Sequence, residues 1–183
     1  LIRSRRGPSG GTFVNRPSQE EVRSNLTTAT ALLVSLGEFS IREILEARQD
    51  LELVCIRHAA QRREEPELAV MREEIEIQER STVSDTDFCA SDVRFHRAIA
   101  DASHNPVLQF AMFTVIEALQ PIENMVVFHV RQRDMIVKQH KKILAALSER
   151  KAGAAAQAVT EQMEYLRARF DEAHELRRAR ISA

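Results

Sequence analysis

Residues that end helices and form tight turns are scarce in this sequence. It has five glycines and five prolines in 183 residues, and three of the glycines lie within the first eleven. In the rest of the chain, apolar residues recur at the three- and four-residue spacing of amphipathic helices. The sequence therefore predicts an all-α fold for nearly the whole chain.

Cysteines and long apolar runs are also scarce. Only Cys55 and Cys89 are present, both inside predicted helices, and the sequence does not open on a secretory signal. These features argue against a disulfide framework and favour a reducing cytoplasm. No run approaches the roughly 18 apolar residues that a membrane span requires. We expect a cytoplasmic protein without a membrane segment, in which both thiols pack in the core.

Charge is unevenly placed along the chain. The net charge of -1 argues against a uniformly basic nucleic-acid-binding protein, yet four arginines precede the first acidic residue, Glu20. Two short extended runs, LIRSRR and TFV, flank the glycine-rich segment GPSGG, a pattern typical of a two-stranded ribbon. A lone hairpin is only marginally stable in water. Residues 1–14 are therefore predicted to belong to a small domain whose earlier part lies upstream, with residues 15–19 as a linker.

Six or seven helices are predicted from residue 18 onward. Start signals occur at Ser18, Ser40 and Asp85, and Pro106 and Pro121 suit the first turn of a helix. The boundary between the last two helices is expected between Ser148 and Gly153. The predicted ranges are 18–36, 41–61, 65–81, 85–103, 106–120, 122–148 with a break, and 152–179.

Four polar side chains interrupt the apolar stripes of three of these helices. Asp92 and His96 fall in the stripe of one helix, His140 in that of a second, and Gln162 in that of a third. Asp92 and His96 lie one turn apart and could both reach one divalent cation, although an Asp that orients its neighbouring His has the same spacing. A lone inward His or Gln is usually satisfied by hydrogen bonds within the core. Together the four residues predict a polar cavity inside a bundle.

Arg48 also lies on a face that should meet the core. It shares a stripe with Ile44, Leu51, Cys55 and Ala59, and a buried guanidinium requires an anion. That anion is either an acid of the protein, such as Glu52 one turn along, or the carboxylate of a ligand. The sequence leaves both interpretations open.

Four segments carry a family resemblance: IRSRRGPSGGTFV, EARQDLE, DVRFHRAIADASHNPVL and HKKILAAL. The first is similar to the wing that closes the winged helix-turn-helix domain of GntR-type bacterial transcription regulators. The other three resemble, in order and spacing, motifs of the all-helical FCD effector domain of the FadR subfamily. The resemblance implies an antiparallel bundle of six to seven helices over residues 20–183, preceded by a wing whose recognition helix lies upstream.

The resemblance also implies a metal site. Many members of that family hold a divalent metal with one Asp and three His, and Asp92, His96 and His140 occupy the first three positions. Gln162 stands where the fourth ligand, a histidine, is expected. An amide oxygen is a weaker ligand than imidazole for zinc or nickel. A site for Zn, Ni or Mn is implied, and Gln162 leaves open loose binding, a harder cation or a metal-free pocket.

The implied activity is allosteric regulation without catalysis. A small carboxylate metabolite would bind in the bundle and alter the affinity of a homodimer for operator DNA. The residues expected to contact this effector are Arg48, Asn105 and Gln162. On the wing, the residues expected to contact phosphate or the minor groove are Arg3, Arg5, Arg6 and Gly10.

Two other classes of function remain as alternatives. A metal-dependent enzyme could use the same site, but the sequence offers no separate general base or nucleophile to accompany it. A dimerisation bundle that binds no ligand would need neither metal nor acid. Turnover of a substrate would favour the enzyme, and indifference to metals and acids would favour the bundle.

Overall fold

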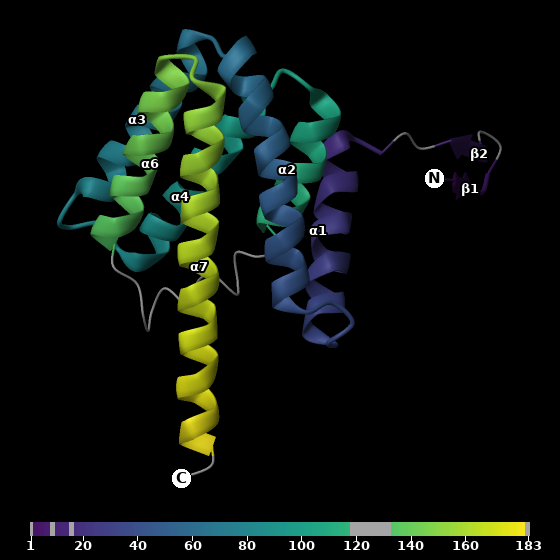
Figure 1. The fold of residues 1–183 in the computed structure, drawn as a ribbon. Helices are drawn as coiled ribbons and strands as arrows, with labels where there is room; N and C mark the ends of the chain where they lie inside the picture. The colour runs from purple at the N-terminus through teal and green to yellow at the C-terminus, as the bar shows by residue number, and fades with distance from the viewer. Residues whose placement is uncertain (1, 8–9, 15–16, 118–132, 182–183) are drawn as a thin grey trace.

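The first described element is a β-hairpin. The computed structural model describes residues 2–7, 10–14, 17–117 and 133–181. Strands β1 (Ile2–Arg5) and β2 (Gly11–Val14) pair antiparallel, with Ile2 opposite Val14 and Arg5 opposite Gly11. The hairpin stands apart from the helices (Figure 1). The predicted ribbon is confirmed, whereas its membership of a larger domain stays a prediction.

The remainder is a helical bundle, which confirms the predicted fold class. Residues 106–117 are also helical, and residues 118–132, which include Pro121 and the predicted break, lie outside the described part. The described ends fall within a few residues of the predicted ones. The helices are α1 (Gln19–Ser35), α2 (Ile41–Arg62), α3 (Glu65–Glu79), α4 (Asp85–Asp101), α6 (Arg133–Ser148) and α7 (Ala152–Ile181).

Local sequence signals explain where these helices begin. Ser18 and Ser40 each form a capping box, in which the serine hydroxyl accepts from a backbone N–H three residues on and a glutamate carboxylate accepts from the serine N–H. In α4 the cap is Ser84, one residue before the predicted signal at Asp85, because Ser84 has the extended backbone that a cap requires. Between α6 and α7, Arg150 adopts φ 56°, which places the helix break in the predicted interval.

The core forms where α2, α3, α4, α6 and α7 pack together. Helix α2 packs against α4, α6 and α7, and α3 packs against α4 and α6 (Figure 1). Phe88, Phe95 and Ile99 of α4 are fully buried, and burying each such side chain contributes about 1.5–3 kcal/mol. Helix α1 lies against residues 106–117, where the Arg23 guanidinium stands over the Phe113 ring. Any polar group on the inner face of α4 is therefore held among apolar neighbours.

None of the helices in the described ranges combines the length and apolarity needed to cross a membrane.

Candidate metal centre

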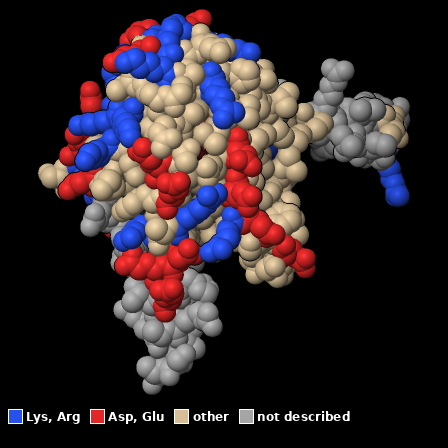
Figure 2. Space-filling view, viewed as in Figure 1, with Lys and Arg blue, Asp and Glu red and all other residues tan. Residues whose placement is uncertain are grey.

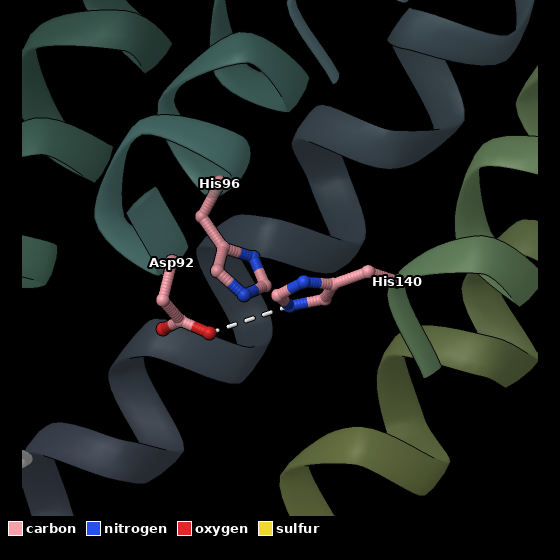
Figure 3. A group of neighbouring side chains, drawn as sticks. All are labelled: Asp92, His96 and His140. Carbon is pink, nitrogen blue, oxygen red and sulfur yellow. Dashed lines mark ion pairs between the residues drawn. The ribbon is translucent and has the colours of Figure 1, made fainter. Parts of the chain in front are cut away.

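The four inward polar residues meet inside the bundle. Asp92 and His96 lie on α4, His140 on α6 and Gln162 on α7, with exposed fractions of 6%, 0%, 0% and 7%. One donor atom from each of Asp92, His96 and His140 can be chosen so that all three lie within 4.8 Å of one another. In Figure 3 these three side chains point toward a common region between α4 and α6. The structure thus brings together residues separated by up to 70 positions in the sequence.

Each imidazole is oriented by an oxygen acceptor on another helix. His96 Nδ1 contacts Glu52 Oε1 of α2 through a short hydrogen bond, and His140 Nδ1 lies 2.8 Å from Gln78 Oε1 of α3. A carboxylate or carbonyl oxygen can only accept, so each Nδ1 carries the hydrogen. A neutral imidazole then presents its lone pair at Nε2. This arrangement, with the outer nitrogen held by an acceptor, is typical of metal-binding histidines.

The inner nitrogens face two further polar groups. His140 Nε2 lies 3.4 Å from Asp92 Oδ1, the pair joined by the dashed line in Figure 3. An ion pair there would need a proton on Nε2, but the hydrogen bond at Nδ1 places the single proton of a neutral ring on the other nitrogen. Gln162 Nε2 lies 3.3 Å from His96 Nε2 and 2.9 Å from His140 Nε2. Donor atoms of Asp92, His96 and His140 therefore converge on one region, as they do around a cation, and the Gln162 amide nitrogen lies against the two imidazoles.

Of the two residues that accept hydrogen bonds from the imidazoles, Glu52 is the charged one. It is fully buried, and its Oε2 lies 3.6 Å from the Nε of the equally buried Arg48. Burial alone would raise the pKa of Glu52, but the hydrogen bond donated by His96 Nδ1 and the nearby charge of Arg48 together hold it below the ordinary value. Glu52 is therefore a carboxylate, and its negative charge favours a hydrogen on His96 Nδ1.

An aromatic ring fixes the second histidine from its face. Phe95 and His140 stack with ring centroids 4.0 Å apart and an interplanar angle of 15°. The imidazole is thus restrained by a ring on one face and by Gln78 at its edge. Because the ring is already restrained, less conformational entropy is lost when the side chain binds a metal.

The residues present fit a divalent cation. Asp92 offers one hard oxygen, and His96 and His140 offer two borderline nitrogens, a ligand set that Zn, Ni and Mn all accept. The Nδ1 acceptors pre-orient both imidazoles. The fourth position is the amide of Gln162, whose nitrogen is the atom that faces the histidines.

Two residues of this centre were missed by sequence reasoning. The sequence suggests Glu52, which lies in the motif EARQDLE, only as a partner for Arg48, and it predicts no role for Gln78. Gln78 continues the stripe of Leu68, Met71 and Ile75, so the rule that singled out Gln162 would also have found it. Glu52 and Gln78 lie on helices that supply neither His96 nor His140, and only the packing of α2 and α3 brings them to the imidazoles.

Of the other predicted site residues, Arg48 adjoins the centre through Glu52. The Arg48 and Glu52 contact agrees with the structural interpretation of Arg48, and a ligand role for Arg48 stays a prediction. Asn105 Oδ1 accepts from the backbone N–H groups of Val107 and Leu108, so it caps the helical segment at 106–117. On the hairpin, Arg6 and Gly10 are exposed.

Neither cysteine is expected to react in the folded protein. Cys55 is fully buried one turn after Glu52, and burial together with that carboxylate raises the pKa of its thiol to about 12. Cys89 is 4% exposed. At pH 8 a disulfide reagent should label neither thiol until the protein is unfolded, because the thiolate is the reactive form. Rapid stoichiometric labelling of the native chain, assigned with Cys55→Ser and Cys89→Ser variants, would contradict this burial.

Comparison with known proteins gives a concordant result. The model of the FCD domain matches residues 43–165. The chain is 32% identical over 195 residues to the putative L-lactate dehydrogenase operon regulatory protein of Escherichia coli K12, covering all of this chain and 71% of that protein. It is also 32% identical over 120 residues to the Bacillus subtilis HTH-type transcriptional regulator YcbG, covering 66% of this chain and 50% of the relative. The chain thus spans half of the length of that relative.

The fold also matches a solved structure. E. coli McbR/YncC superposes with a TM-score of 0.63 over 84% of this chain and 96% of that chain, at 16% identity. At this identity the likeness concerns the fold alone.

Proposed function

The chain belongs to the FCD-domain family of GntR-type transcription regulators, and from this premise we propose that its bundle binds a divalent cation and a small organic acid to control operator binding. The observation that carries the proposal is the convergence of Asp92, His96 and His140, with both imidazoles oriented by acceptors on other helices. Oriented donor atoms of this kind suit the binding of a ligand, and a ligand-responsive regulator requires such a binding site.

The cation would be held by Asp92, His96 and His140. When bound, it would supply a positive charge that attracts one carboxylate oxygen of the effector. Arg48, Asn105 and Gln162 are the proposed protein contacts of that acid. Of these, Gln162 touches both histidines, whereas Arg48 reaches the centre through Glu52.

A groove on the outer side of His140, next to Gln78, is a proposed approach for an anion. It has a volume of about 670 Å³ and lies between the end of α3 and the start of α6, and Gln78 both lines it and accepts from His140. Basic side chains outnumber acidic ones in its lining, which favours a negatively charged ligand. The charged residues of the groove are Glu79, Arg80, Arg133, Asp134, Lys138 and Lys141.

Regulation would work through the helices that share the centre. Its polar residues come from α2, α3, α4, α6 and α7, so a ligand that draws them together changes how these helices pack. A ligand shifts such an equilibrium only by its differential affinity for the two arrangements. In a homodimer, the change would alter the spacing of two DNA-binding domains.

DNA contact is proposed for the hairpin. Arg3, Arg5, Arg6 and Gly10 lie on β1 or in the connection to β2, and arginines there would add phosphate contacts. On the face of the bundle drawn in Figure 2, Lys and Arg are interleaved with Asp and Glu. That mixed face offers no broad basic surface for a duplex.

The relatives favour regulation over catalysis. Those named above are transcriptional regulators, and none is named as an enzyme. A dimerisation bundle that binds no ligand would not require two buried imidazoles with their Nε2 atoms turned toward each other's side of the core. We therefore propose a binding protein.

A thermal-shift experiment tests the proposal. With Zn²⁺ present, a panel of small carboxylates, beginning with L-lactate because of the name of the E. coli relative, should raise the Tm of the chain. His96→Ala and His140→Ala should abolish this shift, because each removes a group that would hold the cation. A full shift in both variants would place the effector site elsewhere, and no shift with any acid would argue for the dimerisation bundle.

A further inference from the structure

The orientation of Gln162 follows from its neighbours. Both Nδ1 atoms donate outward, to Glu52 and to Gln78, so both Nε2 atoms present lone pairs inward. A carbonyl oxygen facing those lone pairs would be repelled. The amide nitrogen faces them instead, at 3.3 Å and 2.9 Å, and its two hydrogens match the two acceptors.

The oxygen of the same amide lacks a comparable contact. Gln162 is 7% exposed, and its Oε1 is buried with no hydrogen-bond partner among the residues that the structure describes. A buried carbonyl without a partner is costly, so the contacts with the histidines must favour the observed orientation. The amide therefore sits where it does because of His96 and His140.

We propose that the Gln162 amide is a built-in competitor for the cation, occupying the same two lone pairs that the metal would use. This inference rests on the proposed metal centre and adds its regulation. A cation can bind His96 and His140 only after both hydrogen bonds to Gln162 are broken. The centre is consequently weak and readily reversible, and loading depends on the free metal concentration.

A histidine at this position would act in the opposite sense. An imidazole offers a lone pair to the cation, whereas the amide nitrogen of Gln162 offers only hydrogens. The substitution thus exchanges a potential ligand for a donor that blocks two ligands. This is the physical reason to expect a different affinity here.

Isothermal titration with Zn²⁺, in competition with a chelator of known affinity, tests the inference on the 183-residue chain. Gln162→Leu removes the donor without supplying a ligand, and zinc affinity should rise about tenfold, the size expected for losing two competing hydrogen bonds. Gln162→His should bind at least as tightly as Gln162→Leu. Gln157→Leu is the matched control, since Gln157 is on the same helix and contacts Glu161 at the surface. It should match the parent.

Each other outcome is decisive. Weaker zinc binding by Gln162→Leu would show that the amide oxygen serves as a ligand, and it would overturn the competitor role while leaving the metal centre intact. An unchanged affinity would also overturn it. If no variant binds zinc, Gln162→His included, the proposed centre and this inference both fail.

A second variant guards against misfolding. Should Gln162→Leu not give the helical circular dichroism of the parent, Gln162→Ala removes the same donor with less bulk and carries the same expectation. In either variant, the rise in Tm at saturating Zn²⁺ should exceed that of the parent, because tighter binding to the folded state stabilises it more.

Discussion

Replacing Arg48 with methionine is expected to lower the free energy of unfolding by about 3 kcal/mol, because the substitution leaves the Glu52 carboxylate buried without the positive charge of its Arg48 neighbour. Arg48 is 2% exposed and Glu52 is fully buried, so water cannot replace the lost partner. For a chain of this size the Tm should fall by roughly 6–12 °C. Urea denaturation followed by circular dichroism gives the free energy directly.

A double variant separates charge from packing. Glu52→Gln removes the charge and keeps a carbonyl oxygen that can accept from His96 Nδ1, so Arg48→Met combined with Glu52→Gln should recover part of the lost stability. Arg57→Met is the control, because Arg57 is exposed on the same helix. It should change stability by no more than about 0.5 kcal/mol. A loss below about 1 kcal/mol in Arg48→Met would show that the pair is not what balances the buried charge.

The second large effect concerns the metal. His140→Ala should lower the affinity for Zn²⁺ by more than about 100-fold, since changes to the groups that merely orient a ligand cost 10–100-fold and this change removes the ligand itself. Gln78→Leu, which removes only the acceptor of His140 Nδ1, should cost about tenfold. Competition titration with a chelator measures both values.

The control for these variants is a histidine outside the centre. His104 Nε2 lies 3.1 Å from Glu67 Oε1, away from the centre. Because His104 adopts φ 49°, asparagine is the suitable replacement at that backbone conformation. His104→Asn should bind zinc as the parent does. If His140→Ala also keeps the parental affinity while circular dichroism shows an intact fold, the cation binds elsewhere.

The inward positions of the site were predictable because helical periodicity is a local property. Asp92, His96, His140 and Gln162 each interrupt an apolar stripe, and a residue in such a stripe faces the core whatever the helix packs against. The same holds for the helix ends, since the serine caps and the break near Arg150 depend on a few adjacent residues. All four inward residues are buried in the structure.

The partners of those residues could not be predicted in the same way. His96 meets Glu52, 44 residues earlier, and His140 meets Gln78, 62 residues earlier. Such pairs depend on the offset of one helix along another, which periodicity does not specify. For Arg48 the sequence allowed an acid of the protein or a ligand, and only the packing of α2 against α4 gave Glu52 two partners at once.

The sequence by itself thus determined the helices, the face that each turns inward and the polar residues on those faces, because these follow from contacts within a few residues. Tertiary structure decided which nitrogens of His96 and His140 point outward, and therefore which atoms of Gln162 they meet. Hydrogen-bond direction depends on distances between separate helices, and these exist only once the bundle has packed.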